Sequence, residues 1–251
     1  MTHAGELRRR YPVFRYERFE IARTATRVTF RFHFSIPPDI SFAPEVHFEG
    51  ISDGWSNVPD EALPNAAFHL GLIEAFSYWK ATASPAIEIH AGPISGDQIR
   101  WWHDLLINGM GEFFYKNDID FTAEDFVKII PAAGSTASTP FSGTLPARSL
   151  MTIGGARDSA LAGGLLRHSG MAFKCMMLNP SSAALQVAQY ATSSDSVIIR
   201  RSICPELLEL NRRGFLNGHT PFSAYLAFLG AASVLLYGYS SVIVANERSS
   251  D

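Results

Sequence analysis

Hydrophobic and polar residues alternate along residues 26–36, which predicts a strand with one buried face. The apolar side consists of Val28, Phe30, Phe32, Phe34 and Ile36, and the other side of Thr29, Arg31, His33 and Ser35. The pair Pro37-Pro38 ends this strand, because proline supplies no backbone N–H for strand pairing. Residues 42–48 then predict a second strand that returns antiparallel to the first.

Helices with one apolar face follow in the first half of the chain. Residues 60–83 carry apolar side chains at helical spacing, which predicts a helix packed on the strands. Residues 86–90 predict a short strand, and Asp97 is the expected N-cap of the next helix. These elements indicate a small α+β domain over residues 1–130.

A change in composition predicts a boundary between two domains. Residues 131–147 are rich in Pro, Gly, Ser and Thr, which is typical of a linker. After it, apolar strands alternate with helices: strands at 149–153, 171–178, 196–200 and 241–245, and helices at 158–169, 181–191 and 221–237. This alternation predicts an α/β fold with a parallel, doubly wound sheet over residues 148–251. Such sheets bind ligands at the carboxyl ends of their strands.

The turn after the first strand of that domain carries the strongest chemical signal. It reads Gly154-Gly155-Ala-Arg157-Asp158-Ser159 and opens a helix. Glycines permit a tight turn and a close backbone approach, and N–H groups at a helix start favour an anion. Arg157 adds positive charge, and Asp158 could position a magnesium ion. We therefore predict a nucleotide-binding turn, the alternative being a strand-to-helix turn without a ligand.

Two further segments place polar side chains at predicted strand ends or helix starts. Asn217-Gly-His219 precedes an apolar helix, which Thr220 could cap with Pro221 in its first turn. A well-capped helix start leaves Asn217 and His219 unexplained, and histidine suits proton transfer near neutral pH. The segment 245–251 follows a buried strand directly. Charged tails are usually solvated, but this position favours a site.

The overall composition excludes some partners. The chain has 251 residues, 47% of them hydrophobic and 18% charged, and a net charge of −3, which argues against nonspecific nucleic-acid binding. Arg8-Arg9-Arg10 is expected to be a solvated tail. Cys175 and Cys204 form no paired motif, so zinc is not indicated, and Cys175 is expected in the core.

The chain carries no sequence feature that we assign to a membrane. Its N-terminus lacks the apolar region of a signal peptide. Residues 221–244 are strongly apolar, but serines and glycines interrupt them, which favours a buried helix followed by a buried strand. We expect a cytoplasmic protein without membrane or nucleic-acid partners.

The three polar segments resemble those of one family, the ATP-dependent UDP-N-acetylmuramoyl-L-alanyl-L-glutamate epimerases of bacterial peptidoglycan synthesis. The first is similar to the PP-loop of ATP pyrophosphatases, Ser-Gly-Gly-x-Asp-Ser, with Gly154-Gly155-Ala156 in place of Ser-Gly-Gly and Arg157 in place of lysine. The segments Asn217-Gly-His-Thr-Pro and Asn246-Glu-Arg-Ser are more specific. The aromatic strands at 14–19 and 30–48 also look like the family's N-terminal region.

The resemblance implies a PP-loop fold and an isomerase that inverts the terminal L-glutamate of a nucleotide-sugar dipeptide to D-glutamate. ATP would be cleaved to AMP and pyrophosphate with Mg²⁺, through an acyl-adenylate whose α-proton is more acidic than that of a carboxylate. Implied phosphate and metal ligands are Gly154, Gly155, Arg157, Asp158 (also for Mg²⁺) and Ser159. Implied catalytic residues are His219, Glu247 and Arg248, and implied substrate ligands are Asn217, Asn246 and Arg201.

Two alternatives stay open. One is another PP-loop adenylating ligase, amidotransferase or tRNA-modifying enzyme, although the last should show a basic face or zinc-binding cysteines. The other is a catalytically silent, divergent member, which Ala156 favours. Because the family's enzymes continue past Asn246-Glu-Arg-Ser, whereas this chain stops at Asp251, we expect an incomplete C-terminal domain.

Overall fold

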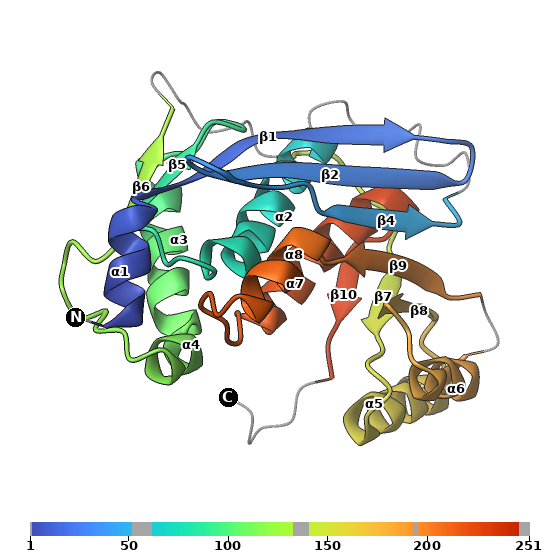
Figure 1. The fold of residues 1–251 in the computed structure, drawn as a ribbon. Coiled ribbons are helices and arrows are strands. Elements are labelled where there is room, and N and C mark those ends of the chain that lie inside the picture. Colours follow the sequence, from blue (N-terminus) through green and yellow to red (C-terminus); the bar gives the residue numbers. More distant parts are fainter. Residues whose placement is uncertain (1, 52–61, 133–140, 193–194, 246–251) are drawn as a thin grey trace.

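One mixed sheet of ten strands organises the part of the chain that the computed structural model describes, residues 2–51, 62–132, 141–192 and 195–245 (Figure 1). Its order is β10-β7-β8-β9-β4-β2-β1-β5-β6, and β3 pairs with β2 beside this path. The strands are β1 (Val13–Arg23), β2 (Arg27–Ile36), β3 (Ile40–Phe42), β4 (Glu45–Glu49), β5 (Ala86–Ile89), β6 (Lys128–Pro131), β7 (Ser149–Thr152), β8 (Phe173–Leu178), β9 (Val197–Ser202) and β10 (Ser241–Ile243). The helices are α1 (His3–Arg10), α2 (Ala62–Trp79), α3 (Gly96–Gly109), α4 (Gly111–Lys116), α5 (Arg157–His168), α6 (Ser182–Ala191), α7 (Pro205–Arg212) and α8 (Phe222–Tyr237).

The antiparallel region of the sheet confirms the alternation predicted for residues 26–36. In β2 the phenylalanines are buried and the intervening residues are half-buried or exposed. The single strand predicted over residues 42–48 is wrong, because β3 and β4 are separate strands, both antiparallel to β2. Pro44 lies between them and has no N–H to continue a ladder, although its carbonyl accepts a hydrogen bond from the Phe32 N–H.

Helices α2 and α8 pack against each other beside the inner face of this sheet (Figure 1). Two local predictions are wrong here. Ser95, and not Asp97, caps α3, because its hydroxyl accepts the Gln98 N–H while the Gln98 side chain accepts the Ser95 N–H. The basic run at residues 8–10 is not a solvated tail, because it forms the end of helix α1. The Arg8 guanidinium donates part-buried hydrogen bonds to the backbone carbonyls of Ala83 and Phe126.

Strands β10, β7, β8 and β9 are parallel, as the sequence predicts. The chain steps from β7 to β8 to β9 through α5 and α6, and then returns through α7 and α8 to β10 on the other side of β7. In Figure 1, α5 and α6 lie together, away from the other helices. The connection that leaves β7 and the connection that enters β10 therefore run in opposite directions across the sheet. This reversal opens a crevice at the carboxyl ends of these strands.

The two halves of the chain share this sheet, because β4 and β9 pair antiparallel. The division into domains on either side of residues 131–147 stays a prediction, and residues 133–140 lie outside the described residues. Helix α8 ends at Gly238, whose φ of 67° provides a left-handed cap. No described helix combines the length and the apolar character that crossing a bilayer requires.

Candidate functional site

A cleft of about 230 Å³ lies at the carboxyl ends of β7, β8 and β10, where α5 and α8 begin. Its lining residues are Thr152, Ile153, Gly154, Ala156, Asp158, Ser159, Met176, Leu178, Phe222, Leu226, Val244 and Ala245. This is the crevice that the reversal of strand order creates, so the structure has a cleft at the edge of the sheet where the sequence predicts a ligand site. The predicted phosphate turn forms one side of it.

The two glycines of this turn have different tasks. Gly155 has a φ of +87°, and a Cβ there would lie 2.7 Å from the Ala184 backbone nitrogen, so the turn packs directly on the start of α6. A Cβ on Gly154 would meet nothing within 4 Å, because its backbone borders open space. Ala156 has a φ of −85°, which any residue adopts, so alanine causes no strain at this position.

Helix α5 begins without a side-chain cap. Its N-cap residue is Ala156, whose side chain cannot accept a hydrogen bond from the N–H groups of the first turn. Uncapped N–H groups at a helix start, together with the helix dipole, favour an anion such as a phosphate. Asp158 lies in this first turn and lines the cleft, whereas the exposed Arg157 begins the helix.

The hydroxyl of Ser159 is used within the turn. It is buried and donates to the Ala156 carbonyl at 2.9 Å, so the predicted contact of Ser159 with phosphate stays a prediction. Asp158 is a hard oxygen ligand of the type that Mg²⁺ accepts alongside phosphate oxygens and water. Among the described residues, no three His, Cys, Asp or Glu side chains are grouped as in an all-protein metal site. The uncapped helix start and the Asp158 carboxylate are groups that could bind a phosphate and a Mg²⁺ ion.

The Asn217–His219 segment contacts α4 and the end of α2. The His219 N–H donates to the Glu112 carboxylate at 2.7 Å, and this bond lowers the pKa of Glu112. The His219 side chain is 89% exposed. Asn217 accepts from Asn117 through its carbonyl, and Lys80 donates to the next carbonyl. The described contacts do not bring His219 and Asn217 to the cleft, and their roles stay predictions.

The start of α8 differs from the prediction in its cap. Pro221 is the N-cap itself, and no side-chain hydrogen bond caps the helix, so the predicted cap by Thr220 is wrong. The cleft also contains Phe222, which the sequence prediction does not include. Helix α8 is apolar on nearly every side, so its pattern gave no signal for which residue would stay exposed.

Arg201 belongs to a buried cluster. Its Nε donates to the Glu74 carboxylate at 2.8 Å, its Nη2 donates to Ser77 at 2.9 Å, and its guanidinium lies 4.6 Å from the centre of the Tyr225 ring. Burial raises the pKa of Glu74, and Arg201 opposes this rise. These contacts give Arg201 a structural role that the sequence did not predict, and its role as a substrate ligand stays a prediction.

Asn246, Glu247 and Arg248 lie outside the described residues. The two residues before them, Val244 and Ala245, line the cleft. The prediction that a site follows the last strand therefore agrees in position with the cleft, as far as Ala245. The roles of the three polar residues stay predictions.

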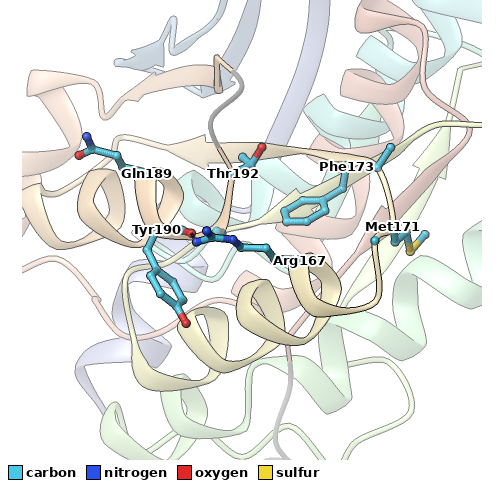
Figure 2. Close-up of a pocket in the computed structure, with 9 residues that line it drawn as sticks. Arg167, Met171, Phe173, Gln189, Tyr190 and Thr192 are labelled. Atoms are coloured by element: carbon cyan, nitrogen blue, oxygen red, sulfur yellow. Dashed lines mark hydrogen bonds between the residues drawn. The ribbon is translucent and has the colours of Figure 1, made fainter.

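A second hollow, of about 400 Å³, lies between the carboxyl ends of α5 and α6 (Figure 2). Arg167 crosses it and donates to the Tyr190 carbonyl at 3.0 Å. The hollow borders Phe173, the first residue of β8, and so lies at the amino end of that strand. Ligands of parallel sheets bind at the opposite edge, so we assign the chemistry to the cleft at Gly154.

Comparison with known proteins shows the family of the chain. The family described as the MurL N-terminal domain matches residues 6–251. The chain belongs to this family. Its match to the MurL N-terminal domain spans both the antiparallel region and the parallel strands that form the cleft.

Curated relatives of this MurL domain carry the name UDP-N-acetyl-alpha-D-muramoyl-L-alanyl-L-glutamate epimerase. One from Xanthomonas oryzae pv. oryzae is 32% identical over 203 residues, covering 75% of this chain and 44% of the relative. One from Salinispora tropica is 29% identical over 182 residues, covering 72% and 38%. The chain thus spans less than half the length of these relatives. No solved structure matches it.

Proposed function

We propose that the chain is the nucleotide-binding part of an enzyme that inverts the terminal L-glutamate of UDP-N-acetylmuramoyl-L-alanyl-L-glutamate with the help of ATP. Membership of the MurL family and the names of the relatives support the reaction. The observation that carries the assignment to this chain is the cleft where the glycine turn and the uncapped start of α5 meet the reversal of strand order.

The finer fold that we propose is a doubly wound PP-loop domain. The order β9-β8-β7-β10 and the strand–turn–helix unit at β7 support it. A right-handed crossover requires α5 and α6 to cover one face of these strands, and α8, on the returning connection, to cover the other. The nucleotide then lies across the ends of β7 and β10.

The chemistry explains why an epimerase uses ATP. A carboxylate resists loss of its α-proton, because the resulting carbanion would lie beside an existing negative charge. Attack of that carboxylate on the α-phosphate of ATP forms an acyl-adenylate and releases pyrophosphate, which removes the charge, so a base can take the proton and the other face can be reprotonated. Water then hydrolyses the acyl-adenylate, which restores the carboxylate of the peptide-bound glutamate in either configuration and releases AMP.

We assign the following tasks to this chain. The backbone at Gly154 and the N–H groups of the first turn of α5 bind phosphate oxygens. Arg157, the first residue of α5, pairs with the same oxygens through its guanidinium. Asp158 binds Mg²⁺ together with the phosphates. His219, Glu247 and Arg248 remain our candidates for catalytic residues, His219 for proton transfer, and Asn217, Asn246 and Arg201 remain our candidates for contacts to the substrate.

The test is to incubate the protein with ATP, Mg²⁺ and the UDP-muramoyl-L-Ala-L-Glu substrate, and to measure AMP and the configuration of glutamate after hydrolysis. We expect AMP and D-glutamate to appear together and only when all components are present. AMP formation with a different acid would indicate another adenylating enzyme. No AMP under any condition would indicate a catalytically silent member.

A further inference from the structure

The cleft has a polar end and an apolar end. The polar end consists of the glycine turn and the uncapped first turn of α5. The apolar end consists of side chains from β8, α8 and the residue after β10, among them Leu178, Phe222, Leu226 and Val244. Phe222 is the one aromatic residue among the described residues of the lining. Phe222 is 51% exposed and borders the cleft.

The ring of Phe222 is supported from behind. It lies parallel to the ring of Tyr225, with 6.0 Å between ring centres and 10° between planes. Tyr225 is buried, and the Arg201 guanidinium lies 4.6 Å from its ring centre. Arg201 is in turn fixed by the fully buried Glu74. Arg201, Tyr225 and Phe222 therefore form a row of contacting groups that is anchored in the core and ends at an exposed ring in the cleft.

We infer that Phe222 is the stacking platform for the planar base of the nucleotide whose phosphates bind at the start of α5. This inference rests on the function proposed above and deepens it. One face of a phenyl ring is free when the other is covered by Tyr225, which agrees with its half exposure, and every nucleobase has a face that can stack on it.

The size of the cleft limits what can bind there. Its volume of about 230 Å³ is below the range of about 300–1,000 Å³ typical of pockets that enclose drug-sized ligands. It therefore encloses a part of a nucleotide, such as the base and neighbouring phosphates, rather than a complete nucleotide-sugar dipeptide. Adenine from ATP and uracil from the UDP-sugar share the flat aromatic face that Phe222 recognises, so the experiment must separate them.

The test compares the affinities of ATP, UDP and inorganic tripolyphosphate for the chain in the presence of Mg²⁺. Phe222→Ala should weaken ATP binding by about 5- to 150-fold, the range expected when one aromatic ring stacked on a base is removed. Tripolyphosphate affinity should stay within about twofold, because it has no base. Phe222→Leu, which keeps an apolar side chain, should lose affinity similarly, and Phe222→Trp should retain it.

The matched control is Tyr190→Ala. Tyr190 is also an exposed aromatic residue, 57% exposed, but it lines the other hollow (Figure 2). Its removal should leave all three affinities unchanged. Thermal melting of each variant checks that the fold is intact.

Each outcome decides a different point. If the unaltered chain binds ATP and neither Phe222→Ala nor Phe222→Leu weakens it, the inference is wrong while the proposed function stands. If UDP and not ATP depends on Phe222, the platform is confirmed for uracil, and the ATP assignment of this cleft is wrong. If neither nucleotide binds, both the proposed function and the inference are overturned.

Discussion

Removal of the Arg201 guanidinium should destabilise this fold far more than removal of both charges of its ion pair. Arg201 in β9 and Glu74 in α2 join the parallel strands to the helix that packs on the antiparallel region. The Glu74 side chain is 0% exposed, and the Arg201 side chain is 14% exposed. Arg201→Met therefore leaves a carboxylate inside the protein without a counter-ion.

Breaking a buried pair by removal of one partner costs about 3–5 kcal/mol, whereas replacing both partners by apolar residues of similar volume is often close to neutral. A chain of this length loses about 2–4 °C of melting temperature per kcal/mol, so Arg201→Met should melt roughly 6–20 °C lower. The double variant Glu74→Leu/Arg201→Met should recover most of that loss.

The loss in Arg201→Met should also depend on pH. Burial already raises the pKa of Glu74, and removal of the opposing arginine raises it further. Between the ordinary glutamate pKa and this raised value the folded state holds a proton that the unfolded state lacks, so stability falls as pH rises through that window. The variant should therefore be more strongly destabilised at pH 8 than at pH 5.

Urea unfolding of the unaltered chain, both single variants and the double variant at these two pH values measures the coupling directly. The control is Arg212→Met, because Arg212 pairs with Glu209 on the surface, with side chains 72% and 53% exposed. Its loss should not exceed about 0.5 kcal/mol. A loss below about 1 kcal/mol for Arg201→Met, without pH dependence, would refute the reasoning from burial.

Three further predictions concern other residues. Burial lowers the pKa of His69 to about 4, so the unfolded chain binds a proton between pH 4 and 6.5 that the folded chain does not. The unfolding free energy of the unaltered chain, measured relative to His69→Gln, should therefore rise by about 3 kcal/mol between these pH values. A constant difference between the two chains in urea unfolding would contradict this. Gly155→Ala should lose about 1–3 kcal/mol because of its positive φ and the nearby Ala184 nitrogen, whereas Gly154→Ala should keep its stability but bind ATP less tightly. Equal melting temperatures for these two variants would be inconsistent with the turn described here. Asp158→Ala should abolish the Mg²⁺ dependence of ATP affinity in titrations with and without EDTA, and an unchanged dependence would rule out Asp158 as a metal ligand.

Local patterns predicted the elements that carry their own signals. The alternation in β2 and the strand–turn–helix order of β7 and α5 depend on residues close together in sequence. The position of the cleft also followed, because parallel strands joined by helices bring their carboxyl ends to one edge.

Contacts between distant residues could not be predicted in this way. Glu74 and Arg201 are 127 positions apart, and neither residue type indicates its partner. The need for glycine at position 155 comes from α6, whose approach is visible only in the fold. Arg8 looked like part of a solvated basic run, yet carbonyls at Ala83 and Phe126, far along the chain, accept its hydrogen bonds.

The most direct test of the account is the position of bound nucleotide. Photolabelling of the chain with 8-azido-ATP and Mg²⁺, followed by peptide mapping, should place the label on residues that line the cleft, such as Leu178, Phe222 or Val244, and excess ATP should prevent it. Label concentrated at Arg167 and Tyr190 in the other hollow, or labelling that ATP does not compete with, would contradict the assignment of the nucleotide to the ends of β7 and β10.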